Sequence, residues 1–242
     1  MLTSNPASPQ TAKDPLKSRG FFITLEGIDG TGKSTQFRRL VRHLRKRGYA
    51  VRATREPGGT AVGEKVRAIL MSEKEELTAL AELALFYAAR AQHVETVIRP
   101  ALESGELVVS DRFNDCSFVY QGHARGLGRR TVKLLDRAIC GPTQPDLTLV
   151  LDLDPRLALE RALGRDARSG TSRFEAAGLE FQRRARAGYL ALARREPRRV
   201  RVIEAGRPPR EVEADIADVV DEVLRESRKP KARMDRSGAK ST

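Results

Sequence analysis

The segment from Gly27 to Ser34 has the residue types and spacing of a phosphate-binding loop. It reads G-x-x-x-x-G-K-S and lies between an apolar run at 21–26 and an amphipathic helical pattern. This order matters because consecutive backbone N–H groups and a helix N-terminus must all point at one anion. Lys33 can reach the β- and γ-phosphates of a nucleotide, and the Ser34 hydroxyl can ligate Mg²⁺. The sequence therefore predicts ATP or GTP binding, although GTP switches, motor ATPases and small-molecule kinases all share this loop.

Asp29 is an unexpected residue inside this loop. A carboxylate near bound phosphates repels them unless a cation or a sugar hydroxyl compensates. Two interpretations stay open from the residues alone: a solvated loop carboxylate with a local backbone hydrogen bond, or a contact to part of a substrate other than phosphate.

Two further clusters follow predicted strands. The segment TREPGGT at 54–60 begins where the second strand ends and contains Arg55, and the segment SDRFNDCSFVYQG at 110–122 contains Asp111 and Arg112. Open parallel sheets bind ligands at the carboxyl ends of their strands. An arginine there can grip phosphate with two hydrogen bonds, and an aspartate can hold Mg²⁺ through water. We favour these roles over a surface turn and a capping aspartate.

Two further segments suggest two more roles, base binding for the first and a lid over the site for the second. The segment FYAARAQHVETVIRPAL at 86–102 reads as a helix with Phe86 and Arg90 one turn apart, so that a ring and a guanidinium could stack on and hydrogen-bond a nucleobase. A core Phe with a surface Arg is the competing interpretation. The segment 160–175 surrounds a Gly/Ser/Thr stretch with arginines, which suits a lid for phosphoryl transfer but also a solvated charged linker. These arginines are Arg161, Arg165, Arg168 and Arg173.

The elements that must position these residues alternate between strands and helices. Strand-like apolar runs occur at 21–26, 50–54, 107–110, 147–152 and 201–204, with longer helical patterns between them. Such alternation predicts an α/β fold in which a five-stranded parallel sheet is flanked by helices. The first helix is the best defined, with apolar residues at helical spacing from 37 to 44 and Gly48 as its stop.

Length and composition indicate one domain with additional ends. The 242 residues can bury one substantial α/β core, which we place at 20–226. Residues 1–19 and the basic tail at 227–242 read as disordered extensions. The net charge of +13, from 45 Lys and Arg against 32 Asp and Glu, suits nucleic acid, an acidic membrane surface or polyphosphate, and does not choose among them.

The cysteines and the hydropathy pattern predict the cellular location of the protein. Cys116 and Cys140 have neither metal-ligand spacing nor the density of a disulfide scaffold, which indicates a reducing compartment. No secretory h-region and no run of membrane-spanning length occurs in the sequence. We therefore predict a soluble, cytoplasmic protein.

Taken together, these motifs resemble those of the bacterial thymidylate kinase family. EGIDGTGKSTQ, TREPGGT, FYAARAQHVETVIRPAL, SDRF…VYQG, PDLTLVLDLDP and the Arg-rich lid occur in family order over about residues 21–226. The resemblance implies a three-layer P-loop kinase fold with a lid at about 163–173. It also implies transfer of the γ-phosphoryl group of ATP to dTMP, giving dTDP for dTTP synthesis, with Mg²⁺ and a homodimer. No membrane and no specific nucleic-acid partner are expected.

The resemblance also implies three sets of site residues. The ATP-binding set is Gly27, Ile28, Asp29, Gly30, Thr31, Gly32, Lys33, Ser34 and Thr35. The dTMP-binding set is Asp29, Arg55, Glu56, Pro57, Phe86, Arg90, Arg112, Ser117, Tyr120 and Gln121. The catalytic set is Lys33, Asp111, Arg165 and Arg173, and the metal ligands are Ser34 and Asp111.

Within the dTMP set, the resemblance gives each side chain a role. Arg55 and Arg112 are expected to hold the acceptor phosphate, and Asp29 approaches the 3′-hydroxyl. Tyr120 crowds the 2′ position and so favours deoxyribose. Phe86 is expected to stack on thymine, and Arg90 and Gln121 are expected to recognise its polar edge.

Departures from the family pattern concern the catalytic arginine and two small changes. The family places this arginine in the loop or in the lid, and the loop here has none, so Arg165 and Arg173 are the best matches, with Arg168 as a competitor in a longer lid. Cys116 stands where the family carries Ser, and Glu204 stands where Asp is commoner.

Two alternatives to a dTMP kinase remain. Another P-loop nucleoside or nucleotide monophosphate kinase would share the loop and lid and differ in its acceptor. A nucleic-acid-binding ATPase would account for the +13 charge, but no basic strand interleaved with aromatics occurs.

Overall fold

A five-stranded parallel sheet forms the centre of the molecule. The computed structural model describes residues 19–72, 74–164 and 173–228. The strands are β1 (Phe21–Glu26), β2 (Val51–Arg55), β3 (Leu107–Asp111), β4 (Leu147–Asp152) and β5 (Val200–Glu204), in the order β2-β3-β1-β4-β5. The predicted α/β class and the five strands are confirmed; β3 and β5 each differ from their predicted bounds by one residue at one end, and β2 by one residue at both ends.

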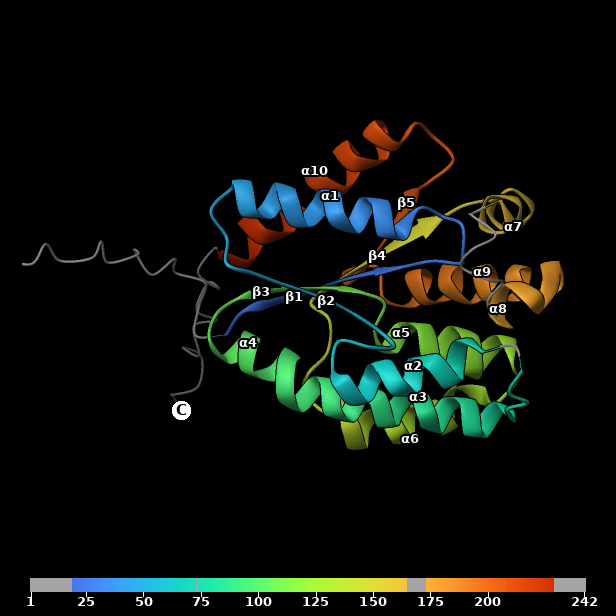
Figure 1. The fold of residues 1–242 in the computed structure, drawn as a ribbon. Coiled ribbons are helices and arrows are strands. Elements are labelled where there is room, and N and C mark those ends of the chain that lie inside the picture. The colour runs from blue at the N-terminus through green and yellow to red at the C-terminus, as the bar shows by residue number, and fades with distance from the viewer. Residues whose placement is uncertain (1–18, 73, 165–172, 229–242) are drawn as a thin grey trace, which may run out of the picture.

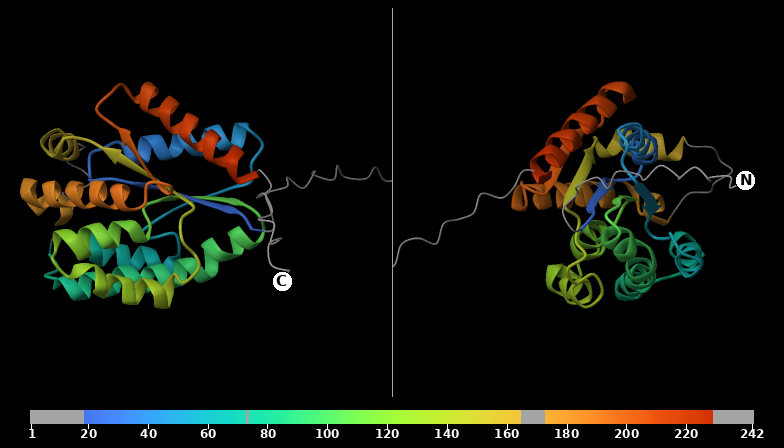
Figure 2. Two further views of the ribbon diagram at one scale, coloured as in Figure 1. Left: turned by 180° about the vertical axis from the view of Figure 1, so that it is seen from behind. Right: turned by 90° about the vertical axis from the view of Figure 1, so that its left-hand side faces the viewer.

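Helices cover both faces of this sheet. The longer helices are α1 (Lys33–Lys46), α2 (Ala61–Met71), α3 (Ala79–His93), α6 (Gly128–Ile139), α7 (Pro155–Leu163), α9 (Gly178–Arg195) and α10 (Pro209–Arg228). The shorter ones are α4 (Arg99–Glu103), α5 (Asn114–Ser117), α8 (Arg173–Ala176) and the π-helical turns η1 (Val94–Ile98) and η2 (Phe118–Ala124). Figure 1 shows α1 and α10 on one face and α2 to α6 on the other, and the end view in Figure 2 shows the same three layers.

The strands are buried because both faces are covered. Successive residues of a strand point to opposite faces, so Phe22 and Val108 pack into the cluster beneath α3 and α4, while Ile23 and Val109 belong to the larger cluster that includes α1 and α10. The near-continuous apolar character of the strands in the sequence follows from this two-sided burial.

The parallel register brings the functional segments to one edge. Asp111, the last residue of β3, pairs with Leu25 of β1 and with Arg55 of β2. The phosphate-binding loop that follows Glu26 therefore begins beside Arg55 and Asp111, as parallel strands require when they end together.

Two predicted helices can be compared with the structure. α1 covers the predicted pattern and ends near Gly48, whose φ of 85° suits a glycine after a helix C-terminus. The helix predicted at 86–102 is part of a longer helical segment: α3 begins after the cap Thr78, and it continues through η1 into α4, which ends at Glu103. The predicted segment was therefore too short at its N-terminal end.

The predicted extensions and lid fall largely outside the described residues. Residues 1–18, 165–172 and 229–242 lie there, so the lid predicted at 163–173 is described only at its edges. α10 continues to Arg228, two residues beyond the predicted domain end at 226. Among the described residues, no helix is long and apolar enough to cross a membrane.

Candidate active site

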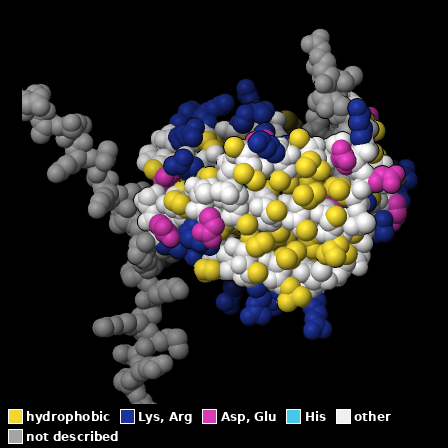
Figure 3. Space-filling model, turned by 60° about the horizontal axis from the view of Figure 1, so that its bottom comes forward, with side chains coloured by type: hydrophobic (Ala, Val, Ile, Leu, Met, Phe, Trp, Pro, Cys, Tyr) yellow, Lys and Arg dark blue, Asp and Glu magenta, His cyan; other side chains and the backbone are white. Residues whose placement is uncertain are grey.

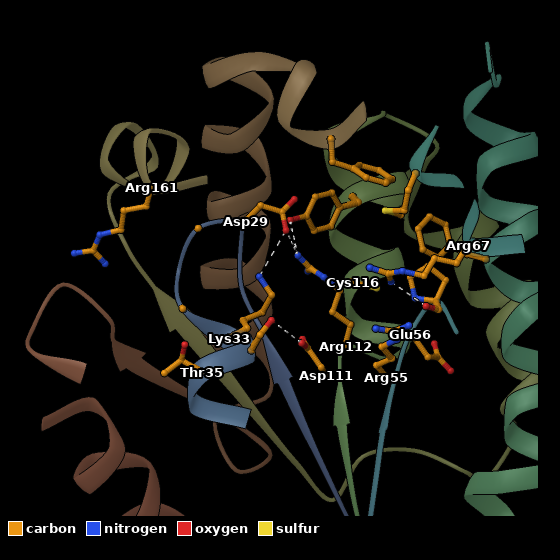
Figure 4. Close-up of a pocket in the computed structure, with 18 of the residues that line it drawn as sticks. Asp29, Lys33, Thr35, Arg55, Glu56, Arg67, Asp111, Arg112, Cys116 and Arg161 are labelled. Carbon is orange, nitrogen blue, oxygen red and sulfur yellow. Dashed lines mark hydrogen bonds and ion pairs between the residues drawn. The ribbon is translucent and has the colours of Figure 1, made fainter. Parts of the chain in front are cut away.

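A cavity of about 520 Å³ opens at the carboxyl edge of the sheet. Most of the predicted site residues line it: Asp29, Gly30, Gly32, Lys33, Ser34, Thr35, Arg55, Glu56, Pro57, Phe86, Asp111, Arg112, Tyr120 and Gln121. Figure 4 shows Thr35 and Arg161 on one side of it, Arg55, Glu56 and Arg67 on the other, and Lys33 and Arg112 between them. Segments from 29 to 121 in the sequence thus form a single site.

The loop from Gly27 to Ser34 has the geometry that an anion cradle needs. It joins β1 to α1, and Gly30 and Gly32 adopt left-handed backbone conformations with φ of 84° and 87°. A Cβ at Gly30 would overlap the carbonyl oxygen of Ala158, so no other residue fits there. The loop is closed from inside by Thr31, whose hydroxyl donates to the carbonyl of Ile28. The loop leads directly into the N-terminus of α1, which begins at Lys33, and a helix N-terminus favours a bound anion.

Lys33 is held in a buried position within this cradle. Its Nζ donates to the carbonyl of Ile28 at 2.7 Å and lies 3.7 Å from the Asp29 carboxylate. Burial and, to a smaller extent, the nearby Arg112 lower the pKa of Lys33 to about 8, against the opposing effect of Asp29. A polyphosphate in the cavity would favour the charged form of this ammonium group.

Ser34 and Asp111 provide oxygen atoms that suit Mg²⁺. The Ser34 hydroxyl donates to the Asp111 carboxylate at 3.3 Å. Among the described residues, no group of three or more His, Cys, Asp or Glu side chains could hold a metal ion. Mg²⁺ prefers oxygen ligands and is commonly held by one or two protein groups together with water and substrate phosphates. The two oxygen ligands present therefore fit Mg²⁺ bound together with a nucleotide.

Arg112 is the most constrained cation of the site. It is the one described non-glycine residue with a positive φ, at 69°. Its guanidinium donates to the carbonyl of Gly27 at 2.9 Å and to the Asp29 carboxylate at 2.6 Å. It also lies 5.2 Å above the ring of Tyr120. Asp29 thus joins Lys33 to Arg112, a role between two cations that the sequence did not suggest.

Arg55 and Arg67 add positive charge near Arg112. Arg55, at the end of β2, donates to Glu64 at 2.9 Å and is half exposed. Arg67 on α2 donates to the carbonyl of Pro57 at 2.9 Å. Burial lowers the pKa of Arg67, and the nearby Arg55 and Arg112 lower it further. These like charges lie close enough to repel one another, which an anion in the cavity would offset.

Glu26 and Tyr189 lie directly behind this group and were missed by the sequence analysis. Glu26 is fully buried at the end of β1; its Oε1 accepts from the backbone N–H of Phe113, and its Oε2 accepts from the Tyr189 hydroxyl at 2.7 Å. The same hydroxyl accepts from Arg112 at 3.2 Å. Burial raises the pKa of Glu26 to about 7, although Arg112 lowers it.

Aromatic residues form the other end of the cavity. Phe86 from α3 lies 6.1 Å from Phe174 of α8 between ring centroids, and Tyr120 lies 5.6 Å from the same ring. Gln121 also lines this end. A flat ring would find stacking partners here.

Arg90 and Ser117 do not line the cavity. Arg90 is fully buried, and its guanidinium donates to Glu56 at 2.7 Å, to the Ser117 hydroxyl at 3.0 Å and to the carbonyl of Phe113 at 2.9 Å. Glu56 in turn contacts His93 at 2.9 Å. Arg90 is thus not the surface arginine of the competing interpretation: it is buried behind the cavity wall, and its contact with the base stays a prediction.

The predicted lid arginines are described only in part. Arg165 and Arg168 lie outside the described residues, and Arg173 is the first residue of α8. Arg161, which the sequence placed among the lid arginines, lines the cavity from α7. Cys116, which departs from the family pattern, lines the cavity as well.

Some of the missed residues had a usable signal in the sequence. Glu26 is a carboxylate at the end of an apolar strand, directly before the loop. Arg67 follows Glu64 by three residues and so shares its face of α2. Tyr189 and Phe174 had no local signal, because their partners lie far away in the sequence.

Comparisons with known proteins agree with this geometry. A family model described as thymidylate kinase matches residues 25–216. The thymidylate kinase of Deinococcus radiodurans is 48% identical over 206 residues, which cover 85% of this chain and 98% of that protein. The thymidylate kinase of Solidesulfovibrio magneticus is 48% identical over 208 residues, covering 84% of this chain and 100% of that protein.

A solved structure extends the similarity to the fold. The crystal structure of thymidylate kinase from Ehrlichia chaffeensis superposes with a TM-score of 0.69 at 31% identity, and the match covers 83% of this chain and 98% of that one. Family match, sequence identity and fold lead to one conclusion: this chain belongs to the thymidylate kinase family.

Proposed function

We propose that the cavity binds ATP and dTMP together, with ATP over the Gly27–Ser34 loop and dTMP between Phe86 and Arg112. As a member of its family, the chain phosphorylates dTMP to dTDP with ATP. One observation carries the proposal for the site. Asp29 lies 3.7 Å from Lys33 and 2.6 Å from Arg112, so that a cation suited to the donor phosphates and one suited to the acceptor phosphate meet in one cavity.

The donor side of the proposal rests on the loop and on α1. The backbone N–H groups from Gly27 to Thr35 would bind the ATP phosphates, and the Lys33 ammonium would leave the carbonyl of Ile28 to reach them. Ser34 and Asp111 would hold Mg²⁺, which when bound neutralises charge on the donor phosphates. The protein would mainly have to position the two substrates and neutralise charge, because the acceptor phosphate attacks in line without a covalent enzyme intermediate.

The acceptor phosphate would bind among three arginines. Arg55 and Arg112 are the residues that the sequence predicts for this role, and the position of Arg67 in the same wall supports its addition. A phosphate placed there offsets their mutual repulsion and can accept paired hydrogen bonds from planar guanidinium groups. Asp29 would accept from the 3′-hydroxyl while it holds Arg112, and Tyr120 would fill the space of a 2′-hydroxyl.

The base would stack on Phe86 at the aromatic end. Gln121 would recognise its polar edge, because this side chain is buried in the cavity wall and its Oε1 has no hydrogen-bond partner among the described residues. Arg90 stands one helical turn from Phe86 and has N–H groups beyond the three that are used. It would supply a donor to the same edge, with Glu56, Pro57 and Ser117 holding this part of the wall.

A lid arginine would stabilise the transferred phosphoryl group. The loop contains no arginine, so we assign this role to Arg165 or Arg173, with Arg168 as the competing residue. The charge that spreads over the transferred group makes such an arginine worth about 10³-fold or more in kcat.

Binding and turnover of two variants test the proposed division of the cavity. Transfer of label from γ-labelled ATP to dTMP should be lost in both Lys33→Ala and Arg112→Ala. Calorimetry should show weakened ATP binding only in Lys33→Ala and weakened dTMP binding only in Arg112→Ala. Loss of ATP binding in both variants would argue against separate donor and acceptor ends.

We also propose a homodimer that forms through the helical face opposite α1. Figure 3 shows hydrophobic side chains gathered on this face, where Figure 1 places α2, α3 and α6. The exposed large apolar residues of these three helices include Val62, Ile69, Leu80 and Leu134. A contiguous apolar surface of this kind is typical of a protein interface. Sedimentation should show a dimer that Leu134→Glu dissociates, whereas Val202→Glu on β5 should leave it intact; a monomeric wild type would refute the dimer.

A cytoplasmic location completes the proposal. Both Cys116 and Cys140 are buried free thiols, which suits a reducing compartment.

A further inference from the structure

The amide group of Gln121 is held in one orientation by a residue outside the cavity. Gln121 lies in η2 and lines the cavity, whereas Glu82 lies in α3, is fully buried and does not line it. The Gln121 Nε2 donates to Glu82 Oε1 at 2.8 Å. The second carboxylate oxygen accepts from Arg125 at 3.2 Å.

The chemistry of the pair leaves this amide no second orientation. An ionised carboxylate accepts hydrogen bonds and cannot donate them, and the Glu82 carboxylate is paired with the Arg125 guanidinium. Rotation of the amide by half a turn would bring the Gln121 oxygen against the Glu82 oxygen, so that two acceptors would meet and one hydrogen bond would be lost. The assignment of the nitrogen and oxygen of Gln121 therefore follows from its partner.

The orientation leaves an acceptor available to a ligand. Because Nε2 is committed to Glu82, Oε1 points away from Glu82, and this buried oxygen has no hydrogen-bond partner among the residues that the structure describes. A buried acceptor without a partner is costly, and a ligand that donates to it removes that cost. A ligand bound at this wall is therefore favoured if it donates a hydrogen bond to Gln121 Oε1.

Pyrimidine bases differ at the atom that such an acceptor would meet. Thymine and uracil carry N3–H, a donor, between two carbonyl oxygens, whereas cytosine carries an unprotonated N3, an acceptor, beside an amino group. A fixed Gln121 Oε1 can accept a hydrogen bond from the N3–H of thymine or uracil. It would repel the unprotonated N3 of cytosine, because both atoms are acceptors. This discrimination is strong where a buried polar group would otherwise stay unpaired.

We propose that Glu82 is a specificity-determining positioning residue: by fixing the Gln121 amide, it makes the site select bases that present a ring N–H over cytosine. The inference rests on the proposed binding of dTMP in this cavity. Glu82 acts through Gln121 and does not line the cavity, and Arg125 supports it by holding its second carboxylate oxygen.

A purely structural role for Glu82 would give a different result. In that case Glu82 would only connect α3 to η2, and its loss would lower turnover of every acceptor by the same factor. A role in orientation changes the ratio between acceptors, so ratios of kcat/KM separate the two.

The test compares dTMP, dUMP and dCMP as acceptors for the wild type and for Glu82→Gln. The substituted amide can donate to Gln121 as well as accept from it, so the Gln121 amide becomes free to turn. We expect kcat/KM for dCMP relative to dTMP to rise roughly 5- to 100-fold, the range for one buried polar mismatch. The ratio of dUMP to dTMP should stay unchanged, because both bases present N3–H.

Asp136→Asn is the matched control. Asp136 is another buried carboxylate that anchors side-chain amides, accepting from Asn114 at 2.9 Å and from Gln144 at 3.1 Å, and it does not line the cavity. It should change stability without changing the dCMP to dTMP ratio. If Glu82→Gln does not fold, Glu82→Met removes the acceptor at similar size and serves in its place.

Two results would overturn the inference. One is an unchanged dCMP to dTMP ratio in a folded Glu82 variant. The other is an equal rise for dUMP and dCMP, which would indicate a loosened pocket. Failure of the wild type to use dTMP at all would instead refute the proposed function, and the inference with it.

Discussion

The Tyr189 hydroxyl connects Arg112 to Glu26. It donates to Glu26 at 2.7 Å and accepts from Arg112 at 3.2 Å. Tyr189 lies on α9, 163 residues after Glu26, so this contact connects the last third of the chain to the first strand. Arg112 also has a left-handed φ of 69°, a conformation that needs support from its surroundings. The position of a proposed phosphate-binding arginine therefore depends on two residues that do not line the cavity.

Removal of the Tyr189 hydroxyl should weaken acceptor binding selectively. Tyr189→Phe keeps the ring and loses the contacts to Arg112 and Glu26, so the guanidinium is less well placed. We expect KM for dTMP to rise about 5-fold, as for the loss of one hydrogen bond to a charged group, with KM for ATP unchanged. Tyr87→Phe, which removes a buried hydroxyl 3.4 Å from Asp136, is the matched control and should change neither KM. Equal changes in both KM values for Tyr189→Phe would indicate a general structural role.

Glu26 should make stability depend on pH. Burial raises its pKa from 4.5 to about 7, which corresponds to about 3 kcal/mol. Because the folded state binds this proton more tightly than the unfolded state, the contribution is fully present below about pH 4.5 and is lost as the pH rises through 7. Glu26→Gln has no such loss. Its melting temperature relative to the wild type should therefore increase by several degrees between about pH 5 and pH 8.

The comparison of melting temperatures between the wild type and Glu26→Gln depends on the charged groups around Glu26. The charged and titratable groups that act on it or respond to it are Arg112, Asp115, Tyr189, Lys33 and Cys116. All of them are present in both proteins, so a difference between the two melting curves reports Glu26 itself. A difference in melting temperature that is constant from pH 5 to pH 8 would contradict the raised pKa.

The sequence predicted the parts of the site that local patterns encode. The phosphate loop is one continuous motif, and the register of a parallel sheet brings Arg55 and Asp111 beside it, so both could be expected at one edge. Contacts between distant segments could not be expected. Neither the pairing of Glu82 with Gln121 nor that of Glu26 with Tyr189 follows from spacing, because each depends on how a helix packs against the sheet or against another helix.

Arg90 illustrates a limit of periodicity. The sequence placed it correctly one turn from Phe86 on a helix, but periodicity could not show that Glu56, from the segment after β2, would reach its guanidinium. A helical face predicts which side chains lie together on that helix, and it does not identify the loop that packs against them.

Arg67 should contribute to phosphate binding and not to base binding. Arg67→Met removes one of three positive charges near the proposed acceptor phosphate. We expect the Kd for dTMP to rise about tenfold, the effect of losing one charge-assisted contact, while the Kd for thymidine, which has no phosphate, stays the same. Calorimetry with both ligands provides this comparison. Weaker binding of both would indicate that Arg67 only anchors the loop through the carbonyl of Pro57.

The lid arginines should affect chemistry more than binding. Arg165→Ala or Arg173→Ala should reduce kcat by about 10³-fold with a modest change in KM for dTMP, because the proposed contact exists in the transition state only. Arg168→Ala is the comparison within the same segment. Unchanged kcat in both Arg165→Ala and Arg173→Ala would refute the lid assignment.

Acceptor preference tests the central claim most directly. A coupled assay of ADP release with the wild-type protein, ATP and Mg²⁺ should give a higher kcat/KM for dTMP than for dUMP, dCMP and AMP. A preference for another monophosphate would contradict the account and favour a different nucleotide kinase. ATP hydrolysis stimulated by nucleic acid, without turnover of any monophosphate, would contradict it altogether.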